Sequence, residues 1–265
     1  MEMRRSKTLD LLRSGKSVSC TKINIADSRV VEIVAMSGID CVWLDMEHTP
    51  NDYGMIEKQI LAAKAYGADV MVRVPRGGYS DYVKPLELDA SGIMVPHIMS
   101  LDDAKNVVKM TRFHPIGLRA LDGGNADGGY CQVNLADYLK QANDRRFVCV
   151  QIEDTEPMAE LDEIAALDGI DMLFFGPGDF SQGLGTPGDF NNPALLDARK
   201  KVADAAVRYG KFAGTVGSLA NRAELAAMGY RFISIGADVV GLGNYFNEIA
   251  AGTQDEVGYY GVNSK

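Results

Sequence analysis

Asp45, Glu47 and His48 come directly after the apolar run Cys41–Leu44, and all three side chains can hold or transfer a proton. Such a run is typical of a buried strand. The carboxyl ends of strands in α/β proteins open onto the crevice or barrel mouth where ligands bind. Histidine is the residue type whose ordinary pKa suits general base work near neutral pH, so His48 is a candidate general base whose ring Asp45 could orient. The alternative is a turn in which these groups are only solvated.

Two further acids, Glu153 and Asp179, follow apolar runs later in the chain. Two carboxylates with water and a chelating substrate form the oxygen-rich shell that Mg²⁺ or Mn²⁺ prefers, so these acids are candidate metal ligands. Ordinary ion pairing at the edge of a barrel is the alternative. Directly before Asp179, the residues Gly176, Pro177 and Gly178 let backbone amides approach a carboxylate beside the metal, although a simple tight turn has the same composition.

Polar residues also end other predicted strands. Arg73 interrupts the apolar run Met-Val-Arg-Val-Pro, where a charge needs a partner or a ligand. Its candidate ligand is a developing enolate oxygen, and a salt bridge to Asp89 or Glu153 is the alternative. Gln151 ends the strand that leads to Glu153, and His97 follows Val-Pro at another strand end, from which it could reach the same region.

The elements that must position these residues follow a regular alternation of short apolar runs and longer amphipathic ones. The predicted strands are Val18–Ile23, Cys41–Leu44, Val70–Val74, Gly92–Pro96, Phe147–Ile152, Met172–Phe175, Phe212–Thr215 and Phe232–Ile235. The predicted helices are Arg29–Met36, Tyr53–Tyr66, Tyr82–Leu88, Leu101–Met110, Leu135–Ala142, Met158–Leu167, Ala194–Tyr209, Leu219–Met228 and Val240–Ala250. Eight strand–helix pairs with short links predict a (β/α)₈ TIM barrel of the α/β class, and an open doubly wound sheet is the alternative.

We expect one domain over residues 1–265. It begins with a short helix at about residues 6–14 and ends with a polar tail at about residues 252–265. A Gly-rich excursion runs from Leu118 to Tyr130, and the segment from Gly176 to Asn192 is predicted as a loop.

The composition narrows the possible partners. The formal net charge of −9 disfavours binding to nucleic acid or to acidic lipid surfaces. No apolar segment approaches the length that spans a bilayer, and we expect a cytoplasmic protein. Three cysteines lie in apolar runs and Cys131 in a polar loop without paired spacing, which predicts reduced thiols and neither disulfides nor a zinc site.

Five short segments occur in one order and spacing: Trp-Leu-Asp45-Met-Glu47-His48-Thr-Pro, Val-Arg73-Val-Pro, Met-Val-Pro96, Gln151-Ile-Glu153 and Phe-Gly176-Pro-Gly-Asp179-Phe-Ser. Together they resemble the HpcH/HpaI aldolase family of metal-dependent pyruvate aldolases, over roughly Leu11 to Ala250. The resemblance implies a (β/α)₈ barrel whose last helix swaps between neighbours, usually in a hexamer built as a dimer of trimers. It also implies an activity like that of 4-hydroxy-2-oxoheptanedioate aldolase, the reversible cleavage of a 4-hydroxy-2-oxo acid to pyruvate and an aldehyde through a metal-bound pyruvate enolate.

The same resemblance implies roles for single residues. Glu153 and Asp179 would ligate a divalent metal, Mg²⁺ or Mn²⁺ with Co²⁺ as a third candidate, which acts as a Lewis acid. Arg73 would steady the enolate oxygen. His48, oriented by Asp45 or Asp89, would remove the proton of the 4-hydroxyl group.

The carboxylate of the substrate is expected to lie against Gln151 and the backbone of Gly176, Pro177, Gly178 and Asp179. Glu47 would lie next to the metal ligands without itself binding the metal.

Departures from the family pattern concern the aldehyde half of the substrate. The excursion Leu118 to Tyr130 is longer and more acidic than in many relatives, and its Asp, Asn and Gly residues favour small polar aldehydes. Lys22 ends the first strand, and His97 stands where an apolar residue is common.

Other functions stay open from the sequence. A Schiff-base aldolase would use Lys22, and a related metal-enolate enzyme would be a citrate-synthase-like condensing enzyme, a decarboxylase or another lyase. A non-catalytic barrel that binds an oxo acid is a further alternative. A phosphate-binding barrel would use Gly214 to Gly217 and the segment after the eighth strand.

Overall fold

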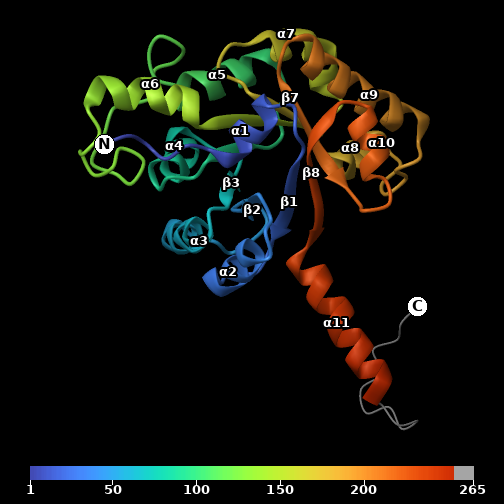
Figure 1. Cartoon of the computed structure of the whole chain (residues 1–265). Coiled ribbons are helices and arrows are strands. Elements are labelled where there is room, and N and C mark those ends of the chain that lie inside the picture. The colour runs from blue at the N-terminus through green and yellow to red at the C-terminus, as the bar shows by residue number, and fades with distance from the viewer. Residues whose placement is uncertain (254–265) are drawn as a thin grey trace.

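Eight parallel strands close into a barrel in the computed structural model, which describes residues 1–253 (Figure 1). Each strand pairs with its neighbours in the chain, and the first pairs with the last, which closes the ring. The strands are β1 (Val18–Ile23), β2 (Cys41–Asp45), β3 (Asp69–Arg73), β4 (Gly92–Val95), β5 (Phe147–Ile152), β6 (Met172–Phe175), β7 (Phe212–Gly217) and β8 (Tyr230–Ala237). The predicted (β/α)₈ TIM barrel is confirmed as a single domain.

Helices follow the strands in the expected alternation. They are α2 (Ser28–Met36), α3 (Tyr53–Ala65), α4 (Tyr79–Glu87), α5 (Leu101–Thr111), α6 (Leu135–Arg145), α7 (Leu161–Ala166), α9 (Pro193–Arg208) and α10 (Arg222–Ala227), with a 3₁₀ turn, η1, at Glu156–Glu160. Several begin at a side chain that accepts a hydrogen bond from the first turn, as Asp27, Asp52 and Ser100 do, and these caps fix where each helix starts.

The barrel interior is packed with apolar side chains. Alternate residues of each strand point inward, and Cys20, Trp43 and Met71 belong to this inner cluster. The opposite faces of the strands pack against the helices in a second, larger cluster. Two residues beyond the inner apolar layer, β1, β2 and β3 each place a polar side chain at the carboxyl end, so the polar groups form a layer on top of an apolar core.

The N-terminal helix α1 (Lys7–Arg13) closes the opposite, amino end of the barrel, close to its expected bounds. Leu9 and Leu12 join the apolar cluster of the barrel interior. The side chain of Ser6 caps the helix, and the carboxylate of Asp69 accepts hydrogen bonds from the Ser6 hydroxyl and the Thr8 amide. The amino end is therefore sealed, which leaves the carboxyl end as the open mouth.

The segment predicted as a loop from Gly176 to Asn192 contains a further helix, α8 (Pro177–Gly183). Pro177 occupies its first position, where the missing N–H costs no helical hydrogen bond. The loop prediction is therefore wrong for these residues, and Asp179 lies in the first turn of a helix.

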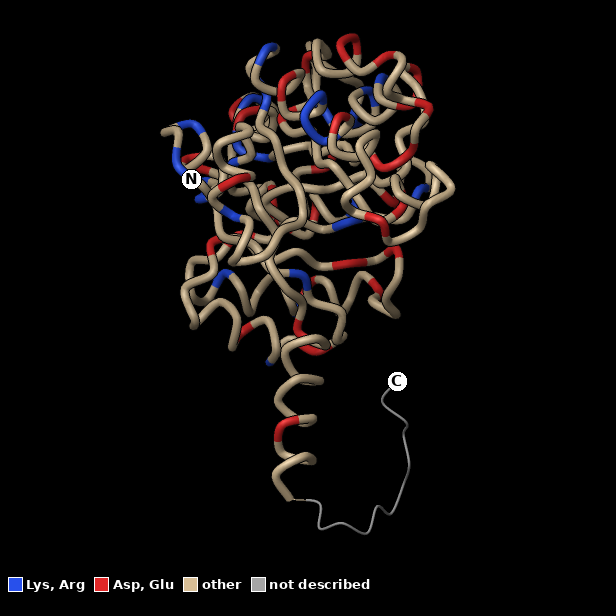
Figure 2. The backbone as a smooth tube through the Cα atoms, turned by 90° about the vertical axis from the view of Figure 1, so that its right-hand side faces the viewer, with Lys and Arg blue, Asp and Glu red and all other residues tan. Residues whose placement is uncertain are grey.

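The last helix, α11 (Asp238–Thr253), begins where β8 ends and extends away from the barrel (Figure 1). None of its residues is buried. Its Tyr245 and Phe246 side chains are 58% and 60% exposed, and Figure 2 shows a helix largely free of charged residues. The predicted polar tail at residues 252–265 falls almost wholly outside the described residues, and the predicted helix swap stays a prediction.

The excursion from Leu118 to Tyr130 is anchored away from the mouth. The buried pair Arg119–Asp127, at 2.9 Å, is joined by the Tyr138 hydroxyl of α6, and the Asp127 amide donates to the Glu87 carbonyl at the end of α4. Within residues 1–253, the hydrogen bonds and ion pairs of this segment involve none of the expected site residues. The expected preference for small polar aldehydes therefore gains no support from these contacts.

Two expectations from the composition can be compared with the structure. All four cysteines are free, in agreement with the expectation of reduced thiols. Among the helices within residues 1–253, none combines the length and the apolar character needed to cross a membrane.

Candidate active site

The open mouth of the barrel gathers most of the side chains that the sequence singled out. Asp45 ends β2 and Arg73 ends β3, and the two residues are direct partners in the parallel register. Gln151 lies in β5 and Glu153 follows it, on the same side of the strand because side chains alternate. The carboxyl ends of β2, β3 and β5 thus contribute to one site.

Arg73 is held rigidly by two carboxylates. Its Nε and Nη2 atoms donate to the two oxygens of Asp45 at 3.0 and 2.6 Å, and its Nη1 atom lies 3.0 Å from Glu47 Oε2. Burial alone would raise the pKa of Asp45, but the hydrogen bonds and charges of Arg73 and Lys22 lower it to about 2. Arg73 therefore pairs with neither Asp89 nor Glu153, the partners considered from the sequence.

His48 lies at the edge of the mouth with 58% of its side chain exposed. The carboxylate that faces its ring is Glu47, whose Oε2 atom is 3.4 Å from His48 Nε2. Both oxygens of Asp45 are instead engaged by Arg73, and one of them also by Lys22. The expectation that Asp45 orients the His48 ring is therefore wrong for this structure, because the β2–β3 register gives Asp45 a stronger partner.

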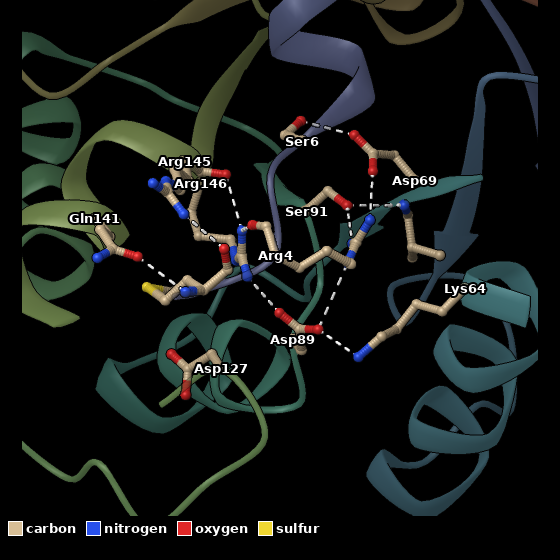
Figure 3. Close-up of polar contacts among 12 residues, drawn as sticks. Arg4, Ser6, Lys64, Asp69, Asp89, Ser91, Asp127, Gln141, Arg145 and Arg146 are labelled. Atoms are coloured by element: carbon tan, nitrogen blue, oxygen red, sulfur yellow. Dashed lines mark hydrogen bonds and ion pairs between the residues drawn. The ribbon is translucent and has the colours of Figure 1, made fainter. Parts of the chain in front are cut away.

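Asp89 lies at the sealed amino end of the barrel and not at the mouth (Figure 3). Its carboxylate is ion-paired with Arg146 and Lys64, and Arg4 Nε lies 3.6 Å away. Asp89 precedes β4, so the start of that strand, and not its end, fixes its position. Within one chain, it is too far from His48 in the fold to act as its expected partner.

Glu153 occupies a crowded and buried position. Its Oε1 atom accepts a hydrogen bond from the His97 amide at 3.0 Å, and its Oε2 atom accepts one from the Gln151 side chain. Burial raises the pKa of Glu153 to about 7; the hydrogen bond from the His97 amide opposes this shift and the negative charge of Asp179 adds to it. The expected acid pair is thus close enough to interact electrostatically.

Gly176 makes this crowding possible. A Cβ atom at this position would lie 2.7 Å from Glu153 Cβ, 2.8 Å from Glu153 Oε2 and 2.9 Å from Gln151 Nε2. At Gly178, by contrast, a Cβ atom would meet nothing within 4 Å. The segment therefore does more than turn the chain, because it leaves space for the acid beside it.

His97 contributes more contacts at the mouth than the sequence indicated. His97 Nδ1 lies 3.0 Å from Asp154 Oδ2, and its Nε2 atom lies 3.6 Å from Glu47 Oε1. Its backbone adopts a φ of 50°, a left-handed conformation uncommon for a residue with a side chain. Asp154 was missed altogether, and its position directly after Glu153 was the available signal.

The acids of the mouth do not form a closed protein cage for a metal. No group of three or more His, Cys, Asp or Glu side chains within residues 1–253 has the geometry of a metal site. A site with two carboxylates, completed by water and substrate, would not produce such a group.

The (β/α)₈ barrel is closed at its amino end, and its open carboxyl end holds a fixed guanidinium beside buried acids. This arrangement is typical of an enzyme, because active sites of this fold lie at the carboxyl ends of the strands. The model of the HpcH/HpaI aldolase/citrate lyase family matches residues 23–244. The chain belongs to this family and is an enzyme of the carbon–carbon lyase class.

Three individual relatives are similar along nearly their whole length. The 4-hydroxy-2-oxo-heptane-1,7-dioate aldolase of Salmonella newport (strain SL254) is 30% identical over 256 residues, which are 97% of this chain and 95% of the relative. The crystal structure of an HpcH/HpaI aldolase from Desulfitobacterium hafniense DCB-2 superposes with a TM-score of 0.88 at 28% identity, covering 96% of this chain and 98% of that one. The crystal structure of the citrate synthase SbnG gives a TM-score of 0.85 at 28% identity, with coverage of 94% and 97%.

Proposed function

We propose that the protein is a divalent-metal-dependent aldolase that reversibly cleaves a 4-hydroxy-2-oxo acid into pyruvate and an aldehyde. The observation that carries this proposal is the fixed Arg73 guanidinium at a mouth that also holds the buried acid Glu153 and its neighbour Asp179. Such a site can stabilise negative charge that develops on an oxo acid. The similarity to an enzyme named as an aldolase supports the same reaction.

Glu153 and Asp179 are the residues that would hold the metal. Their oxygens suit Mg²⁺ or Mn²⁺, with Co²⁺ as a third candidate. Two observations support the fit: the missing side chain of Gly176 lets Glu153 and Gln151 pack against the segment that carries Asp179, and within residues 1–253 the buried Gln151 Oε1 atom has no hydrogen-bond partner. When bound, the ion supplies Lewis-acid charge against the negative charge of the reacting oxo acid.

The residues of the chain itself supply the remaining steps. His48 takes the proton of the 4-hydroxyl group, the C3–C4 bond breaks, the aldehyde leaves and the electron pair stays with the oxo-acid half. Arg73 stabilises the enolate oxygen that results, and its two carboxylate partners keep it in place before the substrate arrives. Glu47 lies beside both His48 and Arg73 and orients them. Gln151 and the backbone at Gly176 to Asp179 hold the carboxylate.

Two assays test this function. In D₂O, the protein with Mn²⁺ is expected to exchange the methyl protons of pyruvate, measured by NMR, and a chelator should stop the exchange until Mn²⁺ is restored. With an added aldehyde, mass spectrometry should detect the 4-hydroxy-2-oxo acid. Exchange that survives complete chelation would contradict the metal-dependent mechanism.

A condensing enzyme is the second candidate, favoured by the similarity to the citrate synthase structure. It would use the same enolate but join it to an oxo acid. Incubation with pyruvate or oxaloacetate and a panel of aldehydes, followed by product analysis, separates the two. A product that joins pyruvate to oxaloacetate, in place of a product that joins pyruvate to an aldehyde, would support the second candidate.

A Schiff-base mechanism on Lys22 would need a free amine in an apolar pocket. Instead, Lys22 Nζ lies 2.8 Å from Asp45 Oδ2. Borohydride reduction in the presence of pyruvate should therefore leave the mass of the protein unchanged. A stable pyruvate adduct on Lys22 would overturn the metal-dependent proposal.

The proposed enzyme is a homo-oligomer. An isolated α11 would expose Tyr245, Phe246 and other apolar side chains to water, which is unfavourable in free energy. A groove of about 480 Å³ between β1, β8, α2 and α10 lies where a barrel normally carries its last helix, and its lining includes Val34, Ile39 and Leu219. Helices exchanged between neighbours would cover both surfaces, in a hexamer built as a dimer of trimers.

A further inference from the structure

Lys22 provides a second fixed cation at the mouth. It follows Cys20 by two residues on β1, so its side chain enters the same interior but lies above the apolar layer. The Lys22 ammonium lies 5.4 Å from the centroid of the Trp43 ring, and Arg73 lies 5.1 Å from it. Trp43 thus supports both cations from below.

Asp45 does not require Lys22 as a partner. Arg73 already donates to both Asp45 oxygens in a bidentate pair, which is a complete arrangement for a carboxylate. An ammonium group has three donors, and within residues 1–253 the ion pair with Asp45 is the polar contact that Lys22 Nζ makes. The Lys22 side chain is also 20% exposed, whereas that of Asp45 is fully buried. Lys22 therefore retains donors that can bind a ligand in the mouth.

The position of Lys22 points to the part of the substrate that it meets. In the closed ring, β1 lies four strands from β5 in either direction, so Lys22 stands on the wall opposite Glu153. Arg73, on β3, lies between them. A substrate with its oxo-acid half at the acid wall and its enolate oxygen at Arg73 extends its other end toward β1.

The charged residues around the mouth indicate which kind of chemical group the substrate carries at the end that extends toward β1. Glu47, Glu153, Asp154 and Asp179 give the β2 to β6 side of the mouth an acidic character, which repels a second anionic group of the substrate. Lys22 lies at the other wall and attracts one. We infer that Lys22 is a specificity-determining residue that binds a carboxylate on the aldehyde half of the substrate, an inference that rests on the proposed aldolase function.

The experiment compares two acceptors in aldol addition to pyruvate: 4-oxobutanoate, which carries a carboxylate, and butanal, which has the same carbon chain without one. The measured quantity is the ratio of kcat/KM for 4-oxobutanoate to that for butanal. Lys22→Met should lower this ratio ~10- to 100-fold, as expected for the loss of a hydrogen bond between charged groups. Lys22→Arg, which keeps the charge, should restore most of the ratio.

Lys58→Met is the matched control, because Lys58 is exposed on α3, outside the barrel. Its ratio should equal that of the wild type. An equal loss with both acceptors in Lys22→Met would overturn the inference, because Lys22 would then act only by holding Asp45 and Arg73.

Exchange of the pyruvate methyl protons separates this inference from the proposed function. Exchange in the wild type together with an unchanged acceptor ratio in Lys22→Met would overturn the role of Lys22 alone. Absence of exchange and of aldol product in the wild type with Mn²⁺ would overturn the proposed function and this inference with it.

Discussion

At the scale of single residues, Asp45 is the carboxylate on which the cations of the mouth depend. It is fully buried and holds Arg73 through two hydrogen bonds and Lys22 through an ion pair. Removing a buried charge leaves its partners unpaired, which is more costly than the pair itself is stabilising. Asp45 therefore matters both to the stability of the fold and to the placement of Arg73.

Asp45→Asn is expected to lower the free energy of unfolding at pH 7 by about 3–5 kcal/mol. The pKa of Asp45 falls from an ordinary 3.8 to about 2 on folding, so its ionisation stabilises the folded chain above pH 4. This contribution, about 2 kcal/mol, disappears as the pH falls from 4 through 2. Urea unfolding of both proteins should show a difference that is constant from pH 5 to 7 and shrinks in acid.

Asp102→Asn provides the control, because Asp102 is exposed and its pair with Lys105 is a surface ion pair. Its difference from the wild type should be small at every pH. A difference for Asp45→Asn that does not vary between pH 2 and 7 would show that Asp45 is not the group that titrates.

Glu153→Gln and Asp179→Asn are expected to reduce Mn²⁺-dependent pyruvate exchange more than ~100-fold, because each removes a proposed ligand of the ion. Binding of Mn²⁺, measured by calorimetry, should weaken in parallel while the circular dichroism spectrum is retained. Glu156→Gln, at an exposed position three residues beyond Glu153, is the control and should behave like the wild type. Full activity in either site variant would remove that residue from the proposed metal site.

The sequence predicted which residue types collect at the mouth, but it did not predict their partners. A strand end can be placed from an apolar run, whereas the contact between Asp45 and Arg73 depends on the register of β2 against β3. Asp89 illustrates the same limit, because its side chain lies at the start of β4 and forms ion pairs with Arg4, Lys64 and Arg146. Its position before a strand was a usable signal of the amino end.

At the scale of elements, the junction between β6 and α8 brings Asp179 close enough to Glu153 for its charge to raise the pKa of Glu153. Gly176→Ala should displace the side chains of Glu153 and Gln151, since its Cβ atom would lie within 3 Å of both. We expect Mn²⁺ binding to weaken ~10-fold or more, as when a group that supports a metal ligand is lost. Calorimetry measures this change.

Gly183→Ala is the control on the same helix, because its Cβ atom would make only an ordinary contact at 3.5 Å with Thr155. Alanine is a better helix former than glycine, so this variant should bind Mn²⁺ normally and unfold no more easily than the wild type. Equal Mn²⁺ affinity in both variants would contradict the steric role of Gly176.

Most elements could be predicted because periodicity and capping residues mark them clearly, and β1, β5 and β6 have their predicted bounds. Helix α8 was missed because Gly-Pro-Gly-Asp is typical of a turn, and two glycines within seven residues hide the helical pattern. Tertiary packing of Phe180 against the core overrides this weak propensity.

At the scale of the whole molecule, the apolar side chains of α11 and the groove beside β1 and β8 are not covered by other parts of residues 1–253. Phe246→Glu should break the proposed assembly, because a charge would have to be buried at an apolar contact. Light scattering coupled to size exclusion should then give the mass of a single chain. Asn247→Glu, the adjacent exposed position, adds the same charge and is the control. A wild type that is itself monomeric would contradict the assembly.

The barrel as a whole could be predicted, since regular alternation of strands and helices permits few other folds. The direction of α11 could not be predicted. The apolar pattern of a helix shows that the helix needs a packing partner, but not whether that partner lies in the same chain. Likewise, the excursion Leu118 to Tyr130 was recognised by its composition, but its location depends on the buried contacts of Arg119 and Asp127.

The seam between β1 and β8 has a consequence for how the chain reaches this state during synthesis. β1 leaves the ribosome before the other strands of the barrel, yet its second hydrogen-bonding partner consists of residues 230–237. Until then the growing sheet has two unpaired edges, and such edges are sites of unwanted pairing between chains. The last strand to be translated is the one that removes both edges at once.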